Sequence, residues 1–434
     1  MAKASINVGL IGLGTVGGGV ARLLMEESQR LSHLLGAELR LAAAVDMDPK
    51  LAQGLGLAAP VYSSDAAHVV ANPEIDIVVE LIGGLEPARS LVLEAIAAGK
   101  QVATANKALL ASHGLEIIQA ARSQGVGVAF EASVGGGIPL IRALRDSLAA
   151  NHITECLGIL NGTCNYILTR MASEGAPFAE VLAAAQAKGY AEADPRFDIE
   201  GMDTAHKLAI ITALVTGAQP RLEDIHCEGI TEITPLDIQF AGEFGFKVKL
   251  LALLRNDGQG VRARVHPTLV PEEHVLASVD GVFNAVHLSG DWVGDVLLYG
   301  RGAGRRPTAS AVVGDVLDLA RDVLAGCSGR VPPLGTAAAG GGRLELAPLE
   351  QALYRYYFRF SAEDRPGVLA EISRVLGEHH ISIAAVTQKG RHAEGPVPIV
   401  MLTHEAKEAD VRRALAEIDS QPAITHKTLL IRVV

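Results

Sequence analysis

The sequence predicts an α/β protein of three successive domains, and three observations lead to this fold class. Over residues 1–140, apolar strand-like runs alternate with helical patterns, which is typical of an open parallel sheet. Over residues 141–325, apolar runs follow one another more directly and indicate an α+β domain. A linker rich in Gly, Ala and Pro, residues 326–353, then leads to a βαββαβ pattern over residues 354–434.

The composition limits the classes of protein to which the chain can belong. A chain of 434 residues is too long for one core, so about two to four domains are expected. Its 49% hydrophobic and 20% charged residues supply ample material for buried cores. The net charge of −11 argues against nucleic acid as the main partner. No stretch approaches the ~20 apolar residues that cross a membrane. The four cysteines include no C-x-x-C pair and the N-terminus carries no signal-peptide pattern, so we expect a cytoplasmic protein without a zinc site.

A glycine-rich turn follows the first predicted strand, residues 6–11, and precedes a helical pattern over residues 20–35. Strand, G-x-G-x-x-G and helix in this order are typical of dinucleotide binding. Gly12 allows the tight turn, Gly14 lets the backbone approach the pyrophosphate, and Gly17 lets helix and strand pack closely. The pyrophosphate then lies at the helix N-terminus, where N–H groups favour anions. The alternative is a glycine-rich turn of some other α/β protein. The predicted dinucleotide-binding residues of this turn are Gly12, Gly14, Thr15, Val16 and Gly17.

An acid ends the second predicted strand, residues 39–45. Asp46 is the expected partner of the adenosine ribose hydroxyls, although it comes later than the usual ~20 residues, which a longer first helix explains. An acid at this place repels a 2′-phosphate and favours NAD, and Arg40 lies too early on the strand to be a clear phosphate ligand. The residues therefore favour NAD and leave use of NADP open.

The alternation continues with strands over residues 75–82, 101–106 and 126–131 and a helix over residues 86–98. Ligands of open α/β sheets bind outside the carboxyl ends of the strands. Lys107, at the end of one of these strands, is therefore expected near the substrate, although a lysine at a helix start is ordinarily just solvated.

The loop after the last of these strands is rich in glycine and lies next to the carboxylate of Glu131. Its carbonyl groups suit a hard monovalent cation as well as they suit a plain turn. From the residues alone it is interpreted as a turn.

The stretch from Gly189 to Lys207 combines an acidic loop with the start of a buried helix, whose apolar run covers residues 208–215. Asp203 and Lys207 are four residues apart and share one helix face. Such a pair is usually a solvated surface pair. Charges at the mouth of an apolar helix are costly unless they are paired or used, which favours a functional role. The carboxylates of the stretch are those of Glu192, Asp194, Asp198, Glu200 and Asp203.

The remaining elements belong to the second and third domains. The second domain is expected to have a helix over residues 141–150, a strand over 153–160, a helix to about 173, strands over 247–254, 261–270, 284–289 and 292–298, and a helix that begins near Pro307 and returns to the first domain. The third is expected to have strands over residues 354–360, 381–388, 397–403 and 427–434 and helices over 362–379 and 406–417.

Motifs along the whole chain resemble those of homoserine dehydrogenase. They are Gly12-Leu-Gly-Thr-Val-Gly17, Thr104-Ala-Asn-Lys107, Asn161-Gly-Thr-Cys-Asn-Tyr166, Gly189-Tyr-Ala-Glu-Ala-Asp-Pro195, Gly201-Met-Asp-Thr-Ala-His-Lys207 and Gly302-Ala-Gly-Arg-Arg-Pro-Thr-Ala309. Near the end, Asp364-Arg-Pro-Gly-Val-Leu369 resembles the signature of an ACT domain.

The resemblance implies reversible NAD(P)-dependent reduction of L-aspartate 4-semialdehyde to L-homoserine, on the branch to threonine and methionine. It implies a Rossmann domain, a catalytic domain that also forms a homodimer or homotetramer, and an ACT domain that senses an amino acid such as threonine. Lys207 is then the general acid/base, Lys107 contacts cofactor and substrate, and Asp203 positions the proton transfer. A lysine suits this step because burial lowers its pKa and its charge stabilises the alkoxide.

Further roles are implied for other matched positions. The substrate residues are Glu192, Asp198, Asp203, Thr163 and Tyr190, with Glu192 on the ammonium group. Gly189 and Gly304 lie at the cofactor, and Glu131 with the carbonyl groups of Val134, Gly136 and Ile138 matches a sodium site. The regulatory residues are Asp364, Gly367, Val368 and Leu369.

Two other functions stay open. A phosphorylating semialdehyde dehydrogenase would need a nucleophilic cysteine, and Cys164 is the candidate, although a small buried cysteine is the commoner role. A non-catalytic sensor made of Rossmann and ACT domains would leave two lysines and an acidic loop without a purpose.

Overall fold

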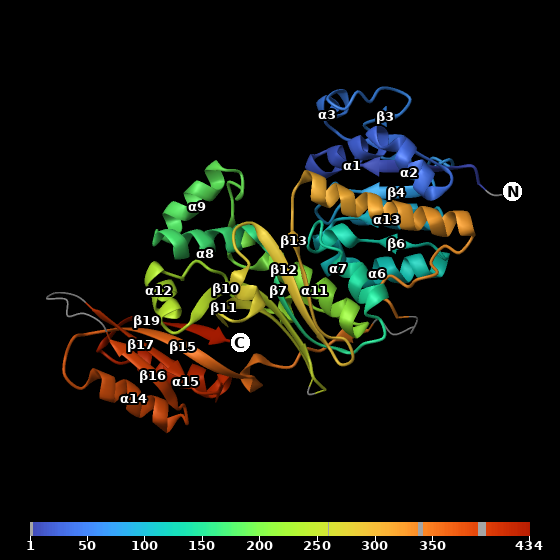
Figure 1. Cartoon of the computed structure of the whole chain (residues 1–434). Helices are drawn as coiled ribbons and strands as arrows, with labels where there is room; N and C mark the ends of the chain where they lie inside the picture. Colours follow the sequence, from blue (N-terminus) through green and yellow to red (C-terminus); the bar gives the residue numbers. More distant parts are fainter. Residues whose placement is uncertain (1–2, 259, 337–341, 389–395) are drawn as a thin grey trace. The chain divides into compact units, whose positions relative to one another are not determined.

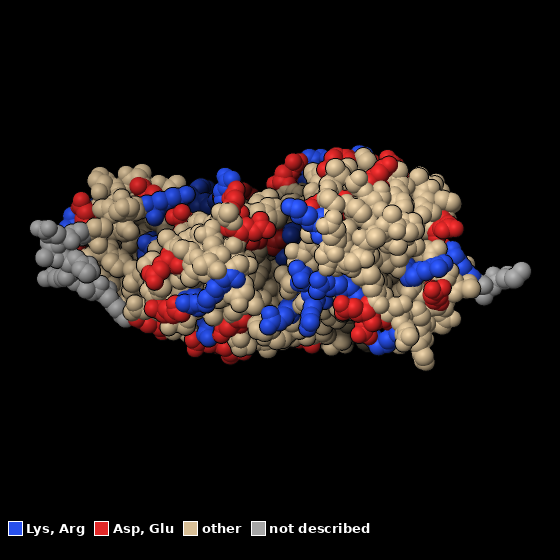
Figure 2. Space-filling model, turned by 90° about the horizontal axis from the view of Figure 1, so that it is seen from above, with Lys and Arg blue, Asp and Glu red and all other residues tan. Residues whose placement is uncertain are grey.

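The computed structural model describes residues 3–258, 260–336, 342–388 and 396–434. These residues form two compact units, both drawn from several stretches of the chain. Unit 1 comprises residues 1–160, 204–225 and 283–345, and unit 2 comprises residues 161–203, 226–282 and 346–434. Within the described ranges, no helix is long and apolar enough to cross a membrane. On the face seen in Figure 2, basic and acidic side chains are interspersed.

A six-stranded parallel sheet forms the core of unit 1, in the order β3-β2-β1-β4-β5-β6 (Figure 1). This is the strand order of a doubly wound dinucleotide-binding fold, and it confirms the predicted Rossmann domain. The order reverses between β1 and β4, which is where such folds bind their ligand. The strands are β1 (Ser5–Ile11), β2 (Glu38–Val45), β3 (Tyr62–Ser63), β4 (Ile77–Glu80), β5 (Gln101–Thr104) and β6 (Val128–Ala129).

Helices cover this sheet. The helical pattern predicted over residues 20–35 is two helices, which begin at Thr15 and are separated at Glu27. The helices that follow the strands are α1 (Thr15–Glu26), α2 (Ser28–Leu35), α3 (Pro49–Gln53), α4 (Ala67–Val70), α5 (Ala88–Ala97) and α6 (Lys107–Gln124).

The late helix α13 (Arg305–Ala325) completes the core of unit 1. It lies against α1 over the sheet (Figure 1), as the predicted return to the first domain requires. Its apolar residues Val312 and Val316 are buried with Leu24 and with Leu10 of β1. More than two hundred residues of sequence therefore separate two neighbouring layers of one core.

Three more strands of unit 1 pair antiparallel in the order β13-β12-β7; they are β7 (Ile153–Ile159), β12 (Phe283–Gly290) and β13 (Gly294–Arg301). The helix predicted over residues 141–150 is shorter: α7 covers Leu140–Arg142 and continues as a π-helical turn over Ala143–Ser147. The short strands β8 (Gln219–Pro220) and β14 (Arg343–Leu344) pair with each other in parallel.

Unit 2 contains a long antiparallel strand pair with helices packed on it. The strands are β10 (Phe246–Asn256) and β11 (Val261–Pro271), and the short β9 (His226–Cys227) pairs with β11. The helices of this part are α8 (Gly162–Glu174), α9 (Phe178–Ala187), α10 (Arg196–Ile199) and α12 (Pro235–Glu243). Helix α11 (Met202–Thr216) begins in unit 2 and continues in unit 1.

The C-terminal part of unit 2 has the predicted βαββαβ order, and its strands lie in the order β19-β15-β17-β16. Its last strand also pairs with β11 in parallel, so one sheet runs through unit 2 from β10 to β16. Two helices cover a core rich in aromatic side chains, among them Tyr356, Phe358 and Phe360. The elements are β15 (Leu353–Ala362), α14 (Val368–Glu378), β16 (Ile383–Gln388), β17 (Val397–Thr403), β18 (Ala406–Lys407), α15 (Glu408–Asp419) and β19 (Ile424–Val433).

Candidate active site

The glycine turn has the close packing that the motif demands. Gly12 has φ of +96°, a conformation that favours glycine, and a Cβ at Gly17 would overlap the carbonyl oxygen of Gly12. Gly14 is the N-cap of α1 and is exposed, with open space where its Cβ would be. Thr15 and Val16 follow in the first turn of α1. The N–H groups of this turn are thus accessible to an anionic group.

Two carboxylates hold the strand ends beside this turn. Asp46 accepts hydrogen bonds from the N–H groups of Leu13 (2.6 Å) and Asp48 (2.9 Å). Glu80, at the end of β4, is fully buried and accepts from the N–H of Ile82 at 3.0 Å and from the hydroxyl of Thr104 at 2.7 Å. Glu80 was not predicted as a site residue, because inside an apolar strand it resembles an ordinary strand residue.

Lys107 begins α6 at the end of β5, at the place predicted for it. The helix is capped by Asn106, whose side-chain oxygen accepts from the N–H of Leu109 at 3.0 Å. The amide nitrogen of Asn106 donates to the carbonyl of Gly84 at 2.7 Å. The residue before Lys107 is thereby fixed on both sides, while the Lys107 side chain is only half-buried.

The two predicted acids of unit 2 meet at one amide group. The Nδ2 of Asn161 donates to Asp198 at 2.8 Å and to Asp203 at 2.9 Å. Its Oδ1 accepts from the N–H of Cys164 at 2.8 Å and so caps α8. Asp203 is 3% exposed, so it is no solvated surface carboxylate. Asn161 was missed as a site residue, although an Asn between a strand and a helix is a common N-cap.

Lys207 lies one turn after Asp203 on α11 and is half-buried. Its Nζ donates to the carbonyl oxygen of Leu160 at 2.6 Å. The sequence predicted a shared face for the two charged side chains, and each has a partner at the end of β7: Leu160 for the lysine and the next residue, Asn161, for the acid.

The other predicted substrate residues of unit 2 lie around the start of α8. The hydroxyl of Thr163 donates to the carbonyl of Tyr190 at 2.7 Å. The Tyr190 side chain is 45% exposed and its ring packs edge-on against Tyr166, with centroids 4.9 Å apart. Glu192 is exposed, and its carbonyl accepts from the side chain of Gln186 at 3.0 Å. Its carboxylate is therefore on the surface of this loop.

Cys164 differs from a nucleophilic cysteine. It is fully buried, and its Sγ donates to the carbonyl of Asp198 at 3.2 Å. A reactive cysteine needs an accessible thiolate, whereas this sulfur is enclosed and donates to a carbonyl oxygen. The geometry argues against the phosphorylating semialdehyde dehydrogenase.

The Glu131 loop is tightly built. The Glu131 carboxylate is buried and accepts from the N–H groups of Ile141 (2.8 Å) and Arg142 (2.9 Å). Burial raises the pKa of Glu131, and the two backbone hydrogen bonds and the Arg142 charge oppose this shift. Val134 and Ile138 are buried, and Gly136 has φ of +55°.

The remaining predicted residues lie in turns. Gly189 (φ +71°) and Gly304 (φ +116°) take conformations that favour glycine, and Gly304 is the N-cap of α13. In the loop before α14, Asp364 and Gly367 are exposed; of the next two residues, Val368 is buried and Leu369 is 38% exposed.

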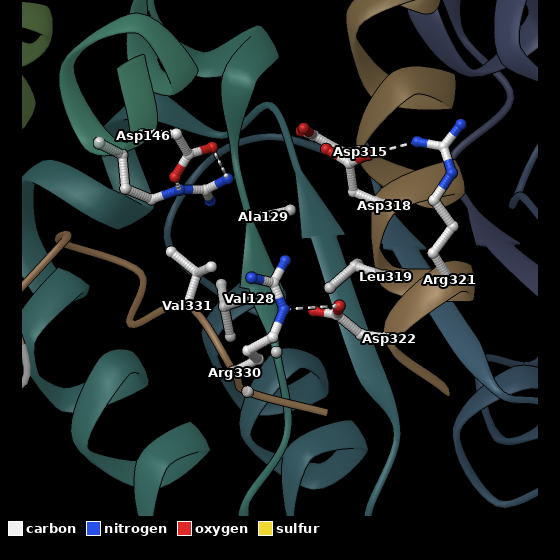
Figure 3. A pocket seen from close by; sticks show the side chains of 13 residues that line it. Val128, Ala129, Asp146, Asp315, Asp318, Leu319, Arg321, Asp322, Arg330 and Val331 are labelled. Carbon is white, nitrogen blue, oxygen red and sulfur yellow. Dashed lines mark hydrogen bonds and ion pairs between the residues drawn. The ribbon is translucent and has the colours of Figure 1, made fainter. Parts of the chain in front are cut away.

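A cavity of about 550 Å³ opens in unit 1 beside the edge strand β6 (Figure 3). Its arginines face neighbouring acids, as in the pair of Arg321 with Asp318 at 2.8 Å. The predicted catalytic lysines are not among the described residues that line it. The lining residues are Gly127, Val128, Ala129, Arg145, Asp146, Asp315, Asp318, Leu319, Arg321, Asp322, Gly329, Arg330 and Val331.

Comparison with known proteins agrees with these observations. Residues 139–317 match the family model of homoserine dehydrogenase, residues 12–131 that of the homoserine dehydrogenase NAD-binding domain, and residues 356–423 that of the ACT domain. The homoserine dehydrogenase of Neisseria gonorrhoeae is 45% identical over 428 residues, which cover 99% of this chain and 98% of that protein.

Solved structures show the same likeness. A homoserine dehydrogenase from Thiobacillus denitrificans has a TM-score of 0.93 at 47% identity and covers 99% of this chain and 98% of its own. A hyperthermophilic archaeal homoserine dehydrogenase in complex with NADPH has a TM-score of 0.63 at 27% identity, covering 73% of this chain and 97% of its own. The chain belongs to the homoserine dehydrogenase family of NAD(P)-dependent oxidoreductases and carries a C-terminal ACT domain.

Proposed function

We propose that Lys207 transfers the proton in the interconversion of L-aspartate 4-semialdehyde and L-homoserine, while Asp198 and Asp203 hold the amino acid. The nicotinamide supplies or accepts the hydride when it is bound. Reduction of the aldehyde develops negative charge on oxygen, and a half-buried ammonium group can neutralise and protonate it. The observation that carries the proposal is the Asn161 amide, which donates to both Asp198 and Asp203; Asp203 lies one helical turn before Lys207 on α11.

The other roles are also part of the proposal. Lys107 contacts cofactor and substrate, and its place at the carboxyl end of β5 supports this. Glu192 binds the substrate ammonium group from the exposed loop. A hydrogen bond from Thr163 to the carbonyl of Tyr190 ties this loop to the start of α8. A carboxylate suits an ammonium group because the two charges attract each other across a charge-assisted hydrogen bond.

We propose that the cofactor binds along the Gly12 turn and at Gly189 and Gly304, with Asp46 near the adenosine ribose. Asp46 already accepts two backbone N–H groups, so it is fixed in place and its charge would repel a 2′-phosphate. This favours NAD, while the NADPH complex of the archaeal relative keeps NADP as the other outcome.

We propose sodium at the Glu131 loop, held by the Glu131 carboxylate and the carbonyl groups of Val134, Gly136 and Ile138. One carboxylate and three carbonyl oxygens form a hard donor set of low charge, which suits a monovalent cation. Each Glu131 oxygen accepts one backbone N–H and keeps a lone pair for a cation. The ion would order the loop that leads into α7.

We propose that an amino acid such as threonine acts at the Asp364–Leu369 loop of the ACT domain.

A homodimer or homotetramer is also proposed, supported by the exposed Trp292 (87%) and Tyr299 (54%) at the edge strand β13. The cysteines of the described chain are free, which supports a reducing compartment such as the cytoplasm.

The test is the initial rate of homoserine oxidation with NAD and with NADP, with and without threonine. Lys207→Ala is expected to lower kcat at least ~100-fold, the usual range for a proton-transferring group, and to leave the Kd of the cofactor nearly unchanged. The exposed Lys247 provides a control, since Lys247→Ala is expected to keep both constants. Retained turnover in Lys207→Ala would remove this lysine from the mechanism.

A further inference from the structure

A buried arginine joins two carboxylates in unit 2. The guanidinium of Arg432, on β19, donates to both oxygens of Glu228 at 2.9 and 3.1 Å and to both oxygens of Glu408 at 3.0 and 2.6 Å. The side chain of Arg432 is 1% exposed and that of Glu408 is 0% exposed. Among basic side chains, only the planar guanidinium can serve two carboxylates in this way. We call Glu228, Arg432 and Glu408 the arginine clamp.

The surroundings of the two carboxylates favour their ionised form. Burial alone would raise the pKa of Glu228, but the hydrogen bond with His226 and the charge of Arg432 outweigh burial and hold this pKa well below its usual range. Burial opposes ionisation of Glu408 as well, and the Arg432 hydrogen bonds again lower the pKa below its usual value. Arg432 and Glu408 are buried and Glu228 is 33% exposed, so removing the Arg432 charge is costly, although Arg412 still pairs with Glu408 at 3.0 Å.

The backbone next to the clamp grips the loop at residues 199–201. The N–H of Ile230 donates to the carbonyl of Ile199 at 2.8 Å. A Cβ at Gly229 would overlap the same carbonyl oxygen, so the two backbones touch. A shift of residues 228–230 would therefore move the loop with it.

Residues 199–201 belong to the four-residue connection between Asp198 and Asp203, and the Asn161 amide holds both of these carboxylates. We infer that the arginine clamp positions these two carboxylates for the substrate, which makes Arg432 a positioning residue for the reaction. The inference rests on the proposed substrate role of Asp198 and Asp203. Strand β19 follows the residues that match the ACT family model, 356–423, and pairs with β15 (Figure 1), so the clamp also connects this part of unit 2 to Glu228.

A second buried ion pair of the ACT domain offers a matched control. Arg359, on β15, donates to Asp237 at 2.6 Å, and Asp237 is 0% exposed. The hydroxyl of Tyr357 donates to the same carboxylate at 3.0 Å. This pair joins β15 to α12 rather than to residues 199–201, so it shares burial and charge with the clamp but not its connection to the loop.

The experiment compares Arg432→Met with Arg359→Met in the full-length enzyme, by the KM of homoserine, the KM of the cofactor, kcat and Tm. Both variants are expected to lower Tm. Only Arg432→Met is expected to raise the KM of homoserine, by roughly 10- to 100-fold, since a positioning error near 1 Å has effects of this size. The KM of the cofactor is expected to stay within about twofold. Arg432→Lys, which keeps the charge, is expected to restore part of the loss.

A double-mutant cycle tests whether the clamp acts as a unit. Glu228→Gln keeps the shape of the side chain and removes its charge, and it is expected to raise the KM of homoserine severalfold. If Glu228 and Arg432 act together, the double variant resembles the worse single variant. Additive effects, or a homoserine KM within twofold of wild type in Arg432→Met, would overturn the inference. If Arg432→Met does not fold, an unchanged KM of homoserine in Glu228→Gln would overturn the inference instead.

Hydrogen exchange at the Ile230 amide separates this inference from the proposed function. Loss of the clamp is expected to speed exchange of this N–H, because its bond to Ile199 loosens. Unchanged exchange in Arg432→Met would reject the positioning role, whatever the kinetics. If instead exchange is faster but Asp198→Asn leaves the homoserine KM unchanged, the proposed role of Asp198 is wrong and the clamp still orders the loop.

Discussion

Replacing Asn161 by aspartate would place a third carboxylate where one amide now serves two acids. Asn161→Asp keeps the N-cap acceptor for Cys164, because an aspartate oxygen accepts the same N–H. It removes the donor that binds Asp198 at 2.8 Å and Asp203 at 2.9 Å. The helix is thus left intact while the charge balance of the site changes.

The magnitude follows from the two lost hydrogen bonds and the new repulsion. A hydrogen bond to a charged group contributes about 1.5–3 kcal/mol, so losing both removes about 3–6 kcal/mol. Two like charges ~4 Å apart repel by about 4 kcal/mol at an effective dielectric constant near 20. That repulsion corresponds to a pKa increase of about 3 for one carboxyl group of the three. One of them is then expected to hold a proton close to neutral pH.

The assay is kcat/KM for homoserine as a function of pH, together with stability against urea. In Asn161→Asp, kcat/KM is expected to fall at least ~100-fold at neutral pH, since about 3 kcal/mol corresponds to two orders of magnitude. The raised pKa means that the folded state binds more protons than the unfolded state, so stability should decrease as pH rises above about 4.

Asn161→Ser separates the two effects. Serine also caps a helix and brings no charge, so this variant should lose activity but gain no new pH dependence. If Asn161→Asp keeps kcat/KM within threefold of wild type with an unchanged pH profile, the two acids are not held as described and the reasoning fails.

Three further predictions concern other parts of unit 1 and the rival chemistry. Burial raises the pKa of Asp315 from 3.8 to about 7, so the folded protein stays protonated here to a higher pH than the unfolded chain does. As pH rises from 4 to 7, stability should therefore fall by up to about 4 kcal/mol. Asp315→Asn should flatten that slope in urea titrations. It should also lower stability overall, because Arg142 loses the nearest of its acidic partners, at 2.9 Å, and keeps Asp318 at 3.1 Å. An unchanged slope would contradict the assignment. Gly17→Ala should weaken cofactor binding more than tenfold by calorimetry, because the new Cβ would overlap the backbone of Gly12. Gly18→Ala is the control and should bind the cofactor normally, since its Cβ would lie 3.2 Å from the carbonyl oxygen of Leu13. Equal affinities of the two variants would be incompatible with the packing described. Cys164→Ser should retain most of its kcat, because the buried thiol donates to a backbone carbonyl and a serine hydroxyl can do the same. Loss of activity in a folded variant would return the thioester mechanism to consideration.

Local patterns were enough to predict five of the six strands of the parallel sheet, whereas the two-residue strand β3 was not predicted. The strand, glycine turn and helix at the start of the chain follow from the alternation of apolar residues and from the conformations that only glycine favours. The break between α1 and α2 at Glu27 was not predicted, since neither Gly nor Pro marks it. The π-helical turn after Arg142 likewise has no local signal.

Long-range contacts account for the part of the site that was not predicted. Asn161 meets Asp198 and Asp203 across 37 and 42 residues, and Arg432 meets Glu228 across 204 residues. Periodicity along the chain carries no information about such pairs, because each partner looks ordinary in its own segment. The acids and Lys207 were found because the resemblance to a family marked their positions.

The return of α13 to the first sheet has a consequence for how this protein is made. A ribosome that has released only the first 140 residues has supplied the six parallel strands but not Val312 and Val316, which fill the core between them and α1. The apolar face of the sheet stays uncovered until the helix emerges, and exposed strands of this kind invite aggregation. The nucleotide-binding fold is therefore expected to be completed late in synthesis, and a fragment cut after residue 140 should bind chaperones where a fragment that regains α13 should not.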